Sequence, residues 1–128
     1  MKIEISVGEA MDRLTILRIK LAEIKDDAKL RNISHEHDKL LESIKNFCEE
    51  HSVSVPQPLS EELQAVNQAL WKVEDELREF ERSKDFGNAF VQKARQVYFL
   101  NDKRASVKRE INLKTNSNLI EEKSYAPY

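Results

Sequence analysis

The feature that most constrains the fold is a run of apolar residues spaced alternately by three and four positions. These residues are Leu63, Val66, Leu70, Val73, Leu77 and Phe80. A stripe with this heptad spacing lies along one face of an α-helix and is buried against a second helix. The pattern therefore predicts a long helix of coiled-coil type that pairs with another helix.

Composition extends this expectation to the whole chain. Only two glycines and three prolines occur in 128 residues, so little of the sequence favours turns. Charged residues make up 34% and aromatic residues 7% of the chain, a balance typical of long amphipathic helices. We predict a single all-α domain, either an antiparallel helical hairpin or a four-helix bundle, with short extended N- and C-terminal segments.

Breaks in the apolar pattern divide the chain into four helices. We place them at about residues 7–24, 27–51, 60–83 and 88–114. Capping residues mark where these helices begin: Ser6 with Glu9 for the first helix, Asp26 or Asp27 for the second and Ser60 for the third.

The remaining segments connect or follow the helices. Residues 2–6 alternate apolar and polar side chains, which favours an extended segment or a short strand. Residues 52–58 form a proline-containing linker, because proline cannot donate a backbone hydrogen bond. Residues 115–128 form an extended tail. Its apolar residues favour folding back on the helices, whereas a mobile terminus is the alternative.

Charge and apolar runs exclude several classes of protein. Lysine and arginine number 21 against 23 aspartate and glutamate, a formal net charge of −2, whereas nucleic-acid binders usually carry a basic excess. No segment approaches the roughly 20 apolar residues of a membrane span, and the N-terminal segment does not read as a signal peptide. The single cysteine, Cys48, suits the cytoplasm. We expect no nucleic-acid partner and a cytoplasmic protein.

Common catalytic and metal-binding motifs are missing. The chain has neither a glycine-rich phosphate loop nor a G-x-S-x-G turn. His35 and His37 are two positions apart, whereas a zinc pair on a helix needs a spacing of four. We predict no metal site and no cofactor, and a non-enzymatic function is favoured although catalysis stays open.

A polar interruption in the last helix raises the main functional question. Its stripe is apolar at both ends but carries Asn101, Arg104 and Lys108 in its middle. A buried guanidinium needs a carboxylate, an anion or water. Three interpretations stay open: side chains that reach solvent at the end of the core, an ion pair with a carboxylate on the first or third helix, and a pocket for phosphate or carboxylate groups. Arg13 is a further candidate ligand of such an anion pocket.

Two other helices carry candidate contact residues. In the third helix, Asn67, Trp71 and Glu74 lie on the shoulder of the heptad stripe, where Glu74 can form an ion pair with Arg78. Asn67 and Glu74 are candidate pocket residues, whereas tryptophan often anchors interfaces. In the first helix, Ile16 and Ile19 form a second apolar face. This second face predicts packing on two sides, either within the chain or against a second copy.

The segments ISVGEAMDRLTILRIKL, VNQALWKVEDELREFERSKDFGNAFVQKARQVYFLNDKRASVKREIN and LIEEKSYAPY cover most of the chain. In these segments the sequence resembles a family of short, all-helical bacterial proteins of unknown function. Members of that family are sometimes encoded beside, or fused to, glycosyltransferase-type and tetratricopeptide-repeat proteins of surface-polysaccharide synthesis. The resemblance implies an accessory role in that setting and a glycosyltransferase-type partner, and it supplies no catalytic residues.

The leading hypothesis is a non-enzymatic helical interaction module that forms a homodimer, with Ile16, Ile19 and Trp71 in the interface. The alternative is a protein that binds a small anion, such as a phosphosugar, a nucleotide or a dicarboxylate. Such a site also resembles, in style alone, the dicarboxylate pocket of the all-helical chorismate mutases. A small helical enzyme is therefore part of this alternative, although likeness of fold does not carry function.

Overall fold

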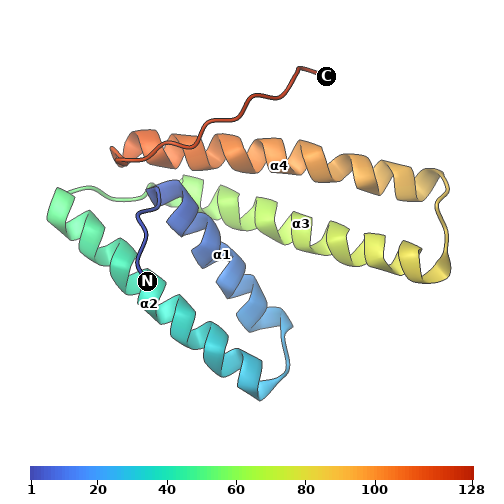
Figure 1. Ribbon diagram of the computed structural model, residues 1–128, viewed down its shortest axis with the longest axis horizontal. Helices are drawn as coiled ribbons and strands as arrows, with labels where there is room; N and C mark the ends of the chain where they lie inside the picture. The colour runs from blue at the N-terminus through green and yellow to red at the C-terminus, as the bar shows by residue number, and fades with distance from the viewer.

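The computed structural model describes residues 1–128 and contains four helices. They are α1 (Val7–Glu23), α2 (Asp27–His51), α3 (Gln57–Ser83) and α4 (Asn88–Lys114). No strand forms, so the predicted all-α fold is confirmed, and residues 2–6 are extended without strand pairing. The helices make two antiparallel hairpins, α1 with α2 and α3 with α4 (Figure 1).

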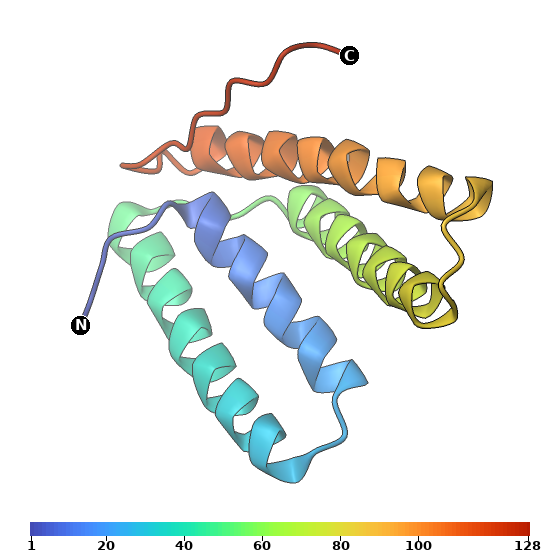
Figure 2. The same ribbon diagram turned by 45° about the vertical axis from the view of Figure 1, so that its right-hand side comes forward.

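The central helix is α1, because it packs against each of the other three helices, whereas α2 adjoins only α1. The two hairpins meet near the beginning of α1 and then diverge, so that the molecule has the outline of an open V (Figure 2). The chain is therefore a pair of hairpins joined at one end, and its four helices do not run side by side along their whole length.

The predicted caps of the first two helices are confirmed. The Ser6 hydroxyl accepts a hydrogen bond from the Glu9 backbone N–H at 3.0 Å, and the Asp26 carboxylate accepts one from the Lys29 N–H at 2.9 Å. Each bond satisfies a donor that has no partner inside the first helical turn. The break between α1 and α2 is thus encoded by Asp26.

The predicted start of the third helix is wrong by three residues. The helix begins at Gln57, with Pro56 at the N-cap and Pro58 in its first turn. The first N–H groups of a helix have no carbonyl partner within the helix, so proline costs little there. Pro58 therefore lies inside α3, and Ser60 is not its cap.

The core lies where the first half of α1 crosses the beginning of α3 and the end of α4. Its buried residues are Val7, Met11, Leu14, Leu59, Leu63, Val107 and Ile111. Half-buried side chains from α2 and the following linker pack against this cluster. From residue 74 to residue 106, in contrast, no residue is buried. We call residues 74–106 the arm, and Figure 1 shows that it projects beyond the α1–α2 hairpin.

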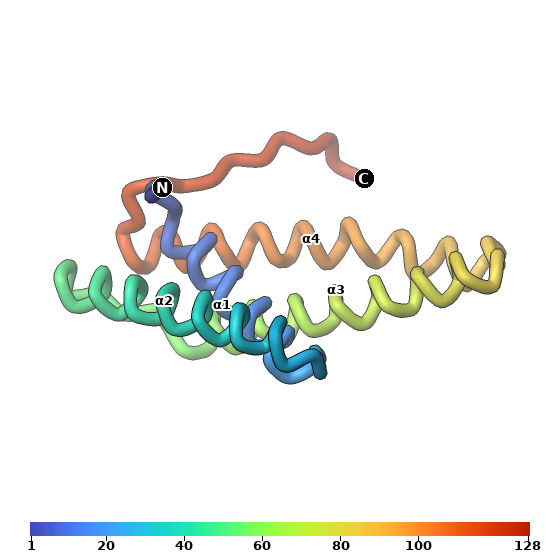
Figure 3. Tube along the Cα trace, turned by 60° about the horizontal axis from the view of Figure 1, so that its bottom comes forward, coloured from blue at the N-terminus to red at the C-terminus, as the bar shows by residue number.

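The C-terminal tail folds back along α4 and lies beside the N-terminal segment at its beginning (Figure 3). Ion pairs hold it, from Lys108 to Glu121 at 3.3 Å and from Arg109 to Glu122 at 2.9 Å. The tail residues from Asn118 onward all remain exposed. The tail is therefore attached to the surface and contributes little to the core.

Candidate functional site

Arg104 forms an ion pair with a carboxylate on the first helix, which is one of the three interpretations of the polar interruption. Its Nε donates to Asp12 Oδ1 at 2.8 Å, and its Nη2 donates to Asp12 Oδ2. Asp12 is only 2% exposed at its side chain, and Arg104 is 30% exposed. The hydrogen bonding of Arg104 to Asp12 raises the pKa of Arg104 above its ordinary value, so the guanidinium is charged at all physiological pH values.

Further hydrogen bonds tie Asp12 to α3. Asn67 Nδ2 donates to Asp12 Oδ1 at 2.9 Å and to Thr15 Oγ1 at 2.7 Å. The Thr15 hydroxyl in turn donates to the Asp12 backbone carbonyl at 2.7 Å. A buried carboxylate is tolerated when it is paired and hydrogen-bonded. Asp12 therefore joins α1, α3 and α4 at a single point.

A second ion-pair group extends from this point toward the tail. Lys108 Nζ lies 2.7 Å from Glu9, 3.3 Å from Glu121 and 3.9 Å from Asp12. Burial alone would lower the pKa of Lys108, but the hydrogen bond with Glu9 and the nearby carboxylates outweigh it, so that the pKa is raised. Burial likewise opposes the charge of Glu9, yet hydrogen bonds from Lys108 and Arg13 lower its pKa.

The beginning of α1 is also fixed to the end of α4. The Gly8 N–H donates to Asn112 Oδ1 at 2.6 Å, and the Val7 N–H donates to Ser117 Oγ at 3.1 Å. A Cβ atom on Gly8 would overlap the backbone carbonyl oxygen of Lys108. Gly8 thus permits the close approach of the two helices. The donors of the first turn are used within the chain and are not free for an anion.

An open cleft of about 430 Å³ lies where α1 diverges from the α3–α4 hairpin. We call it the Trp71 cleft, and its lining residues are Ile16, Asn67, Leu70, Trp71, Glu74, Asp75, Arg78 and Arg104. The cleft brings together two sets of residues that the sequence suggested for different roles. Ile16 and Trp71 are candidate interface residues, and Asn67, Glu74 and Arg104 are candidate ligand residues.

The other candidate residues lie elsewhere. Arg13 is on the solvent side of α1 and pairs with Glu9 at 3.0 Å. Lys108 contacts Glu9 and Glu121 and does not line the cleft. Asn101 lines a separate concavity beneath the tail. Ile19 is 2% exposed, so it is used within the chain and is not available to a second copy, because α1 is covered on both sides.

The charges that face the Trp71 cleft are unevenly satisfied. Arg104 is neutralised by Asp12, as described above. The predicted ion pair between Glu74 and Arg78 does not form. Neither Glu74 nor Asp75 makes a hydrogen bond or an ion pair within the chain. In this part of α3, the ion pair between residues four positions apart joins Lys72 to Glu76 at 4.0 Å. Two carboxylates beside the only tryptophan therefore have no partner.

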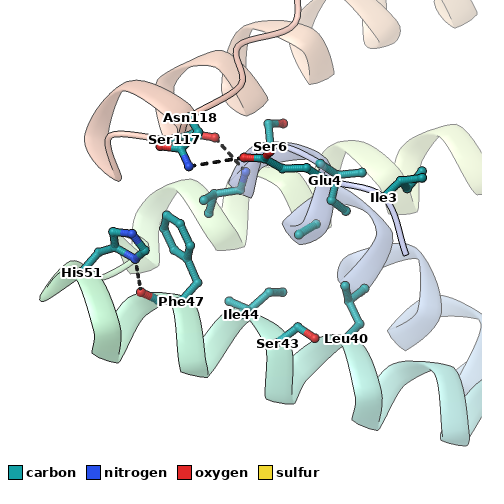
Figure 4. A pocket seen from close by; sticks show the side chains of 13 residues that line it. Ile3, Glu4, Ser6, Leu40, Ser43, Ile44, Phe47, His51, Ser117 and Asn118 are labelled. Atoms are coloured by element: carbon teal, nitrogen blue, oxygen red, sulfur yellow. Dashed lines mark hydrogen bonds between the residues drawn. The ribbon is translucent and has the colours of Figure 1, made fainter. Parts of the chain in front are cut away.

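A second concavity, of about 350 Å³, separates α2 from the N-terminal segment (Figure 4). Its floor is apolar, formed by Leu40, Ile44 and Phe47. Its polar groups already bond within the chain: Asn118 donates to Glu4 at 3.3 Å, and His51 Nδ1 lies 2.9 Å from the Phe47 carbonyl oxygen. This concavity offers fewer unsatisfied polar groups than the Trp71 cleft does.

The fold and the cleft define an all-α protein of two joined hairpins with a mixed-charge cleft at their junction. The chain belongs to DUF6165, a family of unknown function, whose match covers residues 1–128. Neither a curated protein nor a solved structure gives a significant match. No helix combines the length and the apolar character that crossing a membrane requires, and no group of three or more histidine, cysteine or carboxylate side chains is arranged to hold a metal ion.

Proposed function

We propose that the protein is a non-enzymatic interaction module that self-associates as a homodimer through the arm and the Trp71 cleft. The observation that carries this proposal is the absence of any buried residue between residues 74 and 106. Apolar residues continue along both helices of this region but stay half-buried. They are Leu77 and Phe80 in α3 and Phe90, Ala94, Val97 and Leu100 in α4.

In a hairpin of two helices, the apolar residues of each helix are covered only by the other helix, so part of their surface stays exposed to water. Each square ångström of apolar surface removed from water contributes about 25 cal/mol, so further coverage of the arm is favourable. Additional apolar surface is exposed nearby, because Tyr98 and Phe99 are each 44% exposed. A second copy that places its own arm against this one supplies a matching stripe in antiparallel pairing.

The chemistry of the cleft supports binding in preference to catalysis. Asp12 is the only buried carboxylate beside it, and its oxygens accept hydrogen bonds from Arg104 and Asn67. A general base needs a lone pair that reaches the substrate. Asp12 does not meet this need, because its side chain is only 2% exposed and three of its about four lone-pair sites accept hydrogen bonds. The cleft therefore offers recognition through Trp71 and its charged rim.

Sedimentation equilibrium of the full chain tests the proposed dimer. We expect a dimer at micromolar concentrations, and Phe80→Ala and Trp71→Ala should each weaken it. Glu110→Gln is the control, because Glu110 is exposed and lies outside the arm and the cleft. A monomer at every concentration up to the millimolar range would contradict the proposal.

Binding of a small anion is the second candidate, and the exposed part of Arg104 is the observation that favours it. Arg78 lines the same cleft, and two guanidinium groups suit a phosphate or carboxylate. A thermal-shift screen with phosphosugars, nucleotides and dicarboxylates tests it, because a ligand that binds the native state raises the melting temperature. Arg78→Ala should abolish that rise while the fold persists, because Arg78 lines the cleft but has no ion-pair partner within the chain.

The setting implied by the resemblance is an accessory role in bacterial surface-polysaccharide synthesis. In that setting a glycosyltransferase-type protein occupies the surface that otherwise pairs with a second copy. Co-sedimentation with such a protein, repeated with Trp71→Ala, tests this role. Equal binding by the wild type and by Trp71→Ala would place the contact outside the cleft.

A further inference from the structure

The Trp71 cleft contains an unused hydrogen-bond acceptor at its base. Asn67 is 4% exposed, and its amide nitrogen faces Asp12 and Thr15. Because a carboxylate can only accept, the group bonded to Asp12 must be the NH₂ of Asn67, and both of its hydrogens are used. The amide oxygen of Asn67 accepts no hydrogen bond within the chain, yet Asn67 lines the cleft.

The rim of the cleft adds two more acceptors and an aromatic face. Glu74 and Asp75 follow Trp71 by three and four positions, so all three side chains share one side of α3. Both carboxylates line the cleft without a partner in the chain. A cation placed over an indole ring and beside carboxylates is stabilised by the ring quadrupole and by hydrogen bonds.

The balance of charge excludes an anion as the preferred occupant. Asp12 neutralises Arg104, so the guanidinium that suggested an anion pocket has little charge to offer. Counting the two carboxylates, Glu74 and Asp75, against Arg78 leaves one negative charge in excess. A dianion would therefore meet net repulsion, whereas a monocation would meet net attraction.

We infer that the Trp71 cleft binds a guanidinium or ammonium group, which a basic side chain of the second copy supplies. The group stacks on Trp71, donates to the Asn67 amide oxygen and pairs with Glu74 or Asp75. Arginine fits best, because its planar fork stacks on an aromatic ring and donates to a carboxylate in two parallel bonds. This inference rests on the proposed self-association and names the chemistry of its central contact.

The test uses the single tryptophan as a reporter. Trp71 gives one indole N–H resonance in a two-dimensional NMR spectrum of the full chain. The probes are argininamide, citrullinamide and citrate at matched ionic strength. Citrullinamide has the shape of argininamide but no charge on its side chain. The spectra are recorded on the Phe80→Ala variant, whose weakened self-association leaves the cleft open to the probes. We expect argininamide alone to move the indole resonance to saturation.

Variants then separate the cation from the anion hypothesis. Glu74→Gln and Asp75→Asn should each weaken the binding of argininamide by about two- to fivefold, as expected for exposed ion pairs. Arg78→Ala should strengthen it by a similar factor, because a competing cation is removed. Glu110→Gln, which removes the same charge far from the cleft, should leave it unchanged.

Two outcomes would overturn the inference. Saturation by citrate, weakened by Arg78→Ala, would show that the cleft is an anion site. An indole resonance that no probe moves would show that the cleft recognises no such group. Sedimentation is an independent measurement, so a dimer with no response to argininamide would retain the proposed function and remove only the cationic contact.

Discussion

The junction of the two hairpins and the arm differ in the kind of contact that holds their helices together. At the junction, buried polar groups such as Asp12, Asn67 and Asn112 lie among the apolar core residues. In the arm, apolar residues continue along both helices but none is buried. The ion pair that joins these helices, Lys93 with Glu76 at 2.7 Å, is partly exposed. The junction is held by directional hydrogen bonds and ion pairs, whereas the arm presents partly exposed apolar side chains.

This difference shows what each kind of contact can determine. Buried hydrogen bonds have strict geometry, and an unmade one costs about 1–3 kcal/mol, so Asp12 permits one arrangement of three helices. Apolar contact has no direction, so a stripe such as the one in the arm fits many partners of suitable shape. The junction therefore defines the fold of one chain, and the arm is suited to contact a second one.

Asp12→Ala should have the largest effect and would confirm the role of the junction. The substitution leaves the half-buried Arg104 without its carboxylate, and breaking a buried ion pair costs about 3–5 kcal/mol. Urea unfolding followed by circular dichroism measures the loss. The double variant Asp12→Leu with Arg104→Leu is the control and should recover most of the stability. A loss of less than about 1 kcal/mol would mean that this ion pair contributes no more to stability than one on the surface.

A matched pair of leucines on α3 compares the two regions directly. Leu63 lies in the core and is fully buried, whereas Leu77 lies in the arm and is half-buried. Leu63→Ala should cost about 2–5 kcal/mol and leave the association of folded chains unchanged. Leu77→Ala should cost about 1 kcal/mol in the folded chain but weaken self-association about tenfold, which corresponds to 1.4 kcal/mol. Equal effects of the two substitutions on both measurements would remove the distinction between junction and arm.

Gly8→Ala tests the close approach of α1 and α4. The added methyl group overlaps the Lys108 carbonyl oxygen and crowds Asn112, and such overpacking typically costs about 1–3 kcal/mol. Alanine is the better helix former, so the same substitution at an exposed helical position would stabilise by about 1 kcal/mol. Thermal unfolding measures the sign of the change. A higher melting temperature would mean that the helices do not approach closely at this glycine.

The sequence predicts the elements of this protein better than it predicts their contacts. The bounds of the last helix, 88–114, agree with α4, because periodicity and caps are local signals. The start of α3 differs from the predicted one, because proline is disfavoured in helix interiors but is common in the first helical turn, where Pro58 lies. For Ile19 the sequence predicts packing either within the chain or against a second copy, and it does not choose between them. The structure shows packing within the chain, because α1 adjoins all three other helices.

In the candidate site, too, the sequence predicts local features better than contacts between helices. A carboxylate on the first or third helix is one of the three interpretations that the sequence leaves open for Arg104. The choice of Asp12 depends on the angle at which α1 crosses α4. Asn67 and Glu74 were correctly grouped with Trp71, because helical spacing alone places them on one side. A glycine inside a helix is a signal of close packing, so Gly8 could have been recognised, whereas Glu121 comes from the tail and carries no local signal.

The pH dependence of stability should distinguish the ion pairs of the junction, where Lys108 is 12% exposed, from the pair of the arm, where Lys93 is 33% exposed. The pKa of Glu9 is lowered from 4.5 and that of Lys108 is raised from 10.5. Their stabilisation is therefore complete between these values, is lost as the pH falls through the lowered pKa of Glu9, and is lost as the pH rises through the raised pKa of Lys108.

Salt provides the control for this measurement. In the arm, the hydrogen bond from Lys93 also lowers the pKa of Glu76. Lys93 is 33% exposed at its side chain whereas Lys108 is 12% exposed, so salt should screen the pair of the arm more strongly. Part of the stability lost at low pH comes from Glu76 and part from Glu9, and the variants Glu76→Gln and Glu9→Gln identify the two parts. At high ionic strength, the part from Glu76 should disappear and the part from Glu9 should persist. If salt reduces both parts equally, the junction is no better shielded from solvent than the arm.

The smallest effect on stability is expected at the tail, where a spectroscopic change is nevertheless clear. Tyr128 donates a hydrogen bond to the carboxylate of Asp102, which raises its pKa from 10.0 to about 12. A raised pKa means that this contact is complete below pH 10.0 and is lost as the pH rises toward about 12. In an ultraviolet titration, one tyrosine should ionise at a higher pH than the others. Asp102→Asn should abolish this difference while unfolding by urea stays nearly unchanged.

If no tyrosine ionises at a raised pH, the tail does not lie along α4. The outer side of the arm near Tyr98 would then be free for a partner, and the contrast between a locked junction and an open arm would be larger than the structure shows.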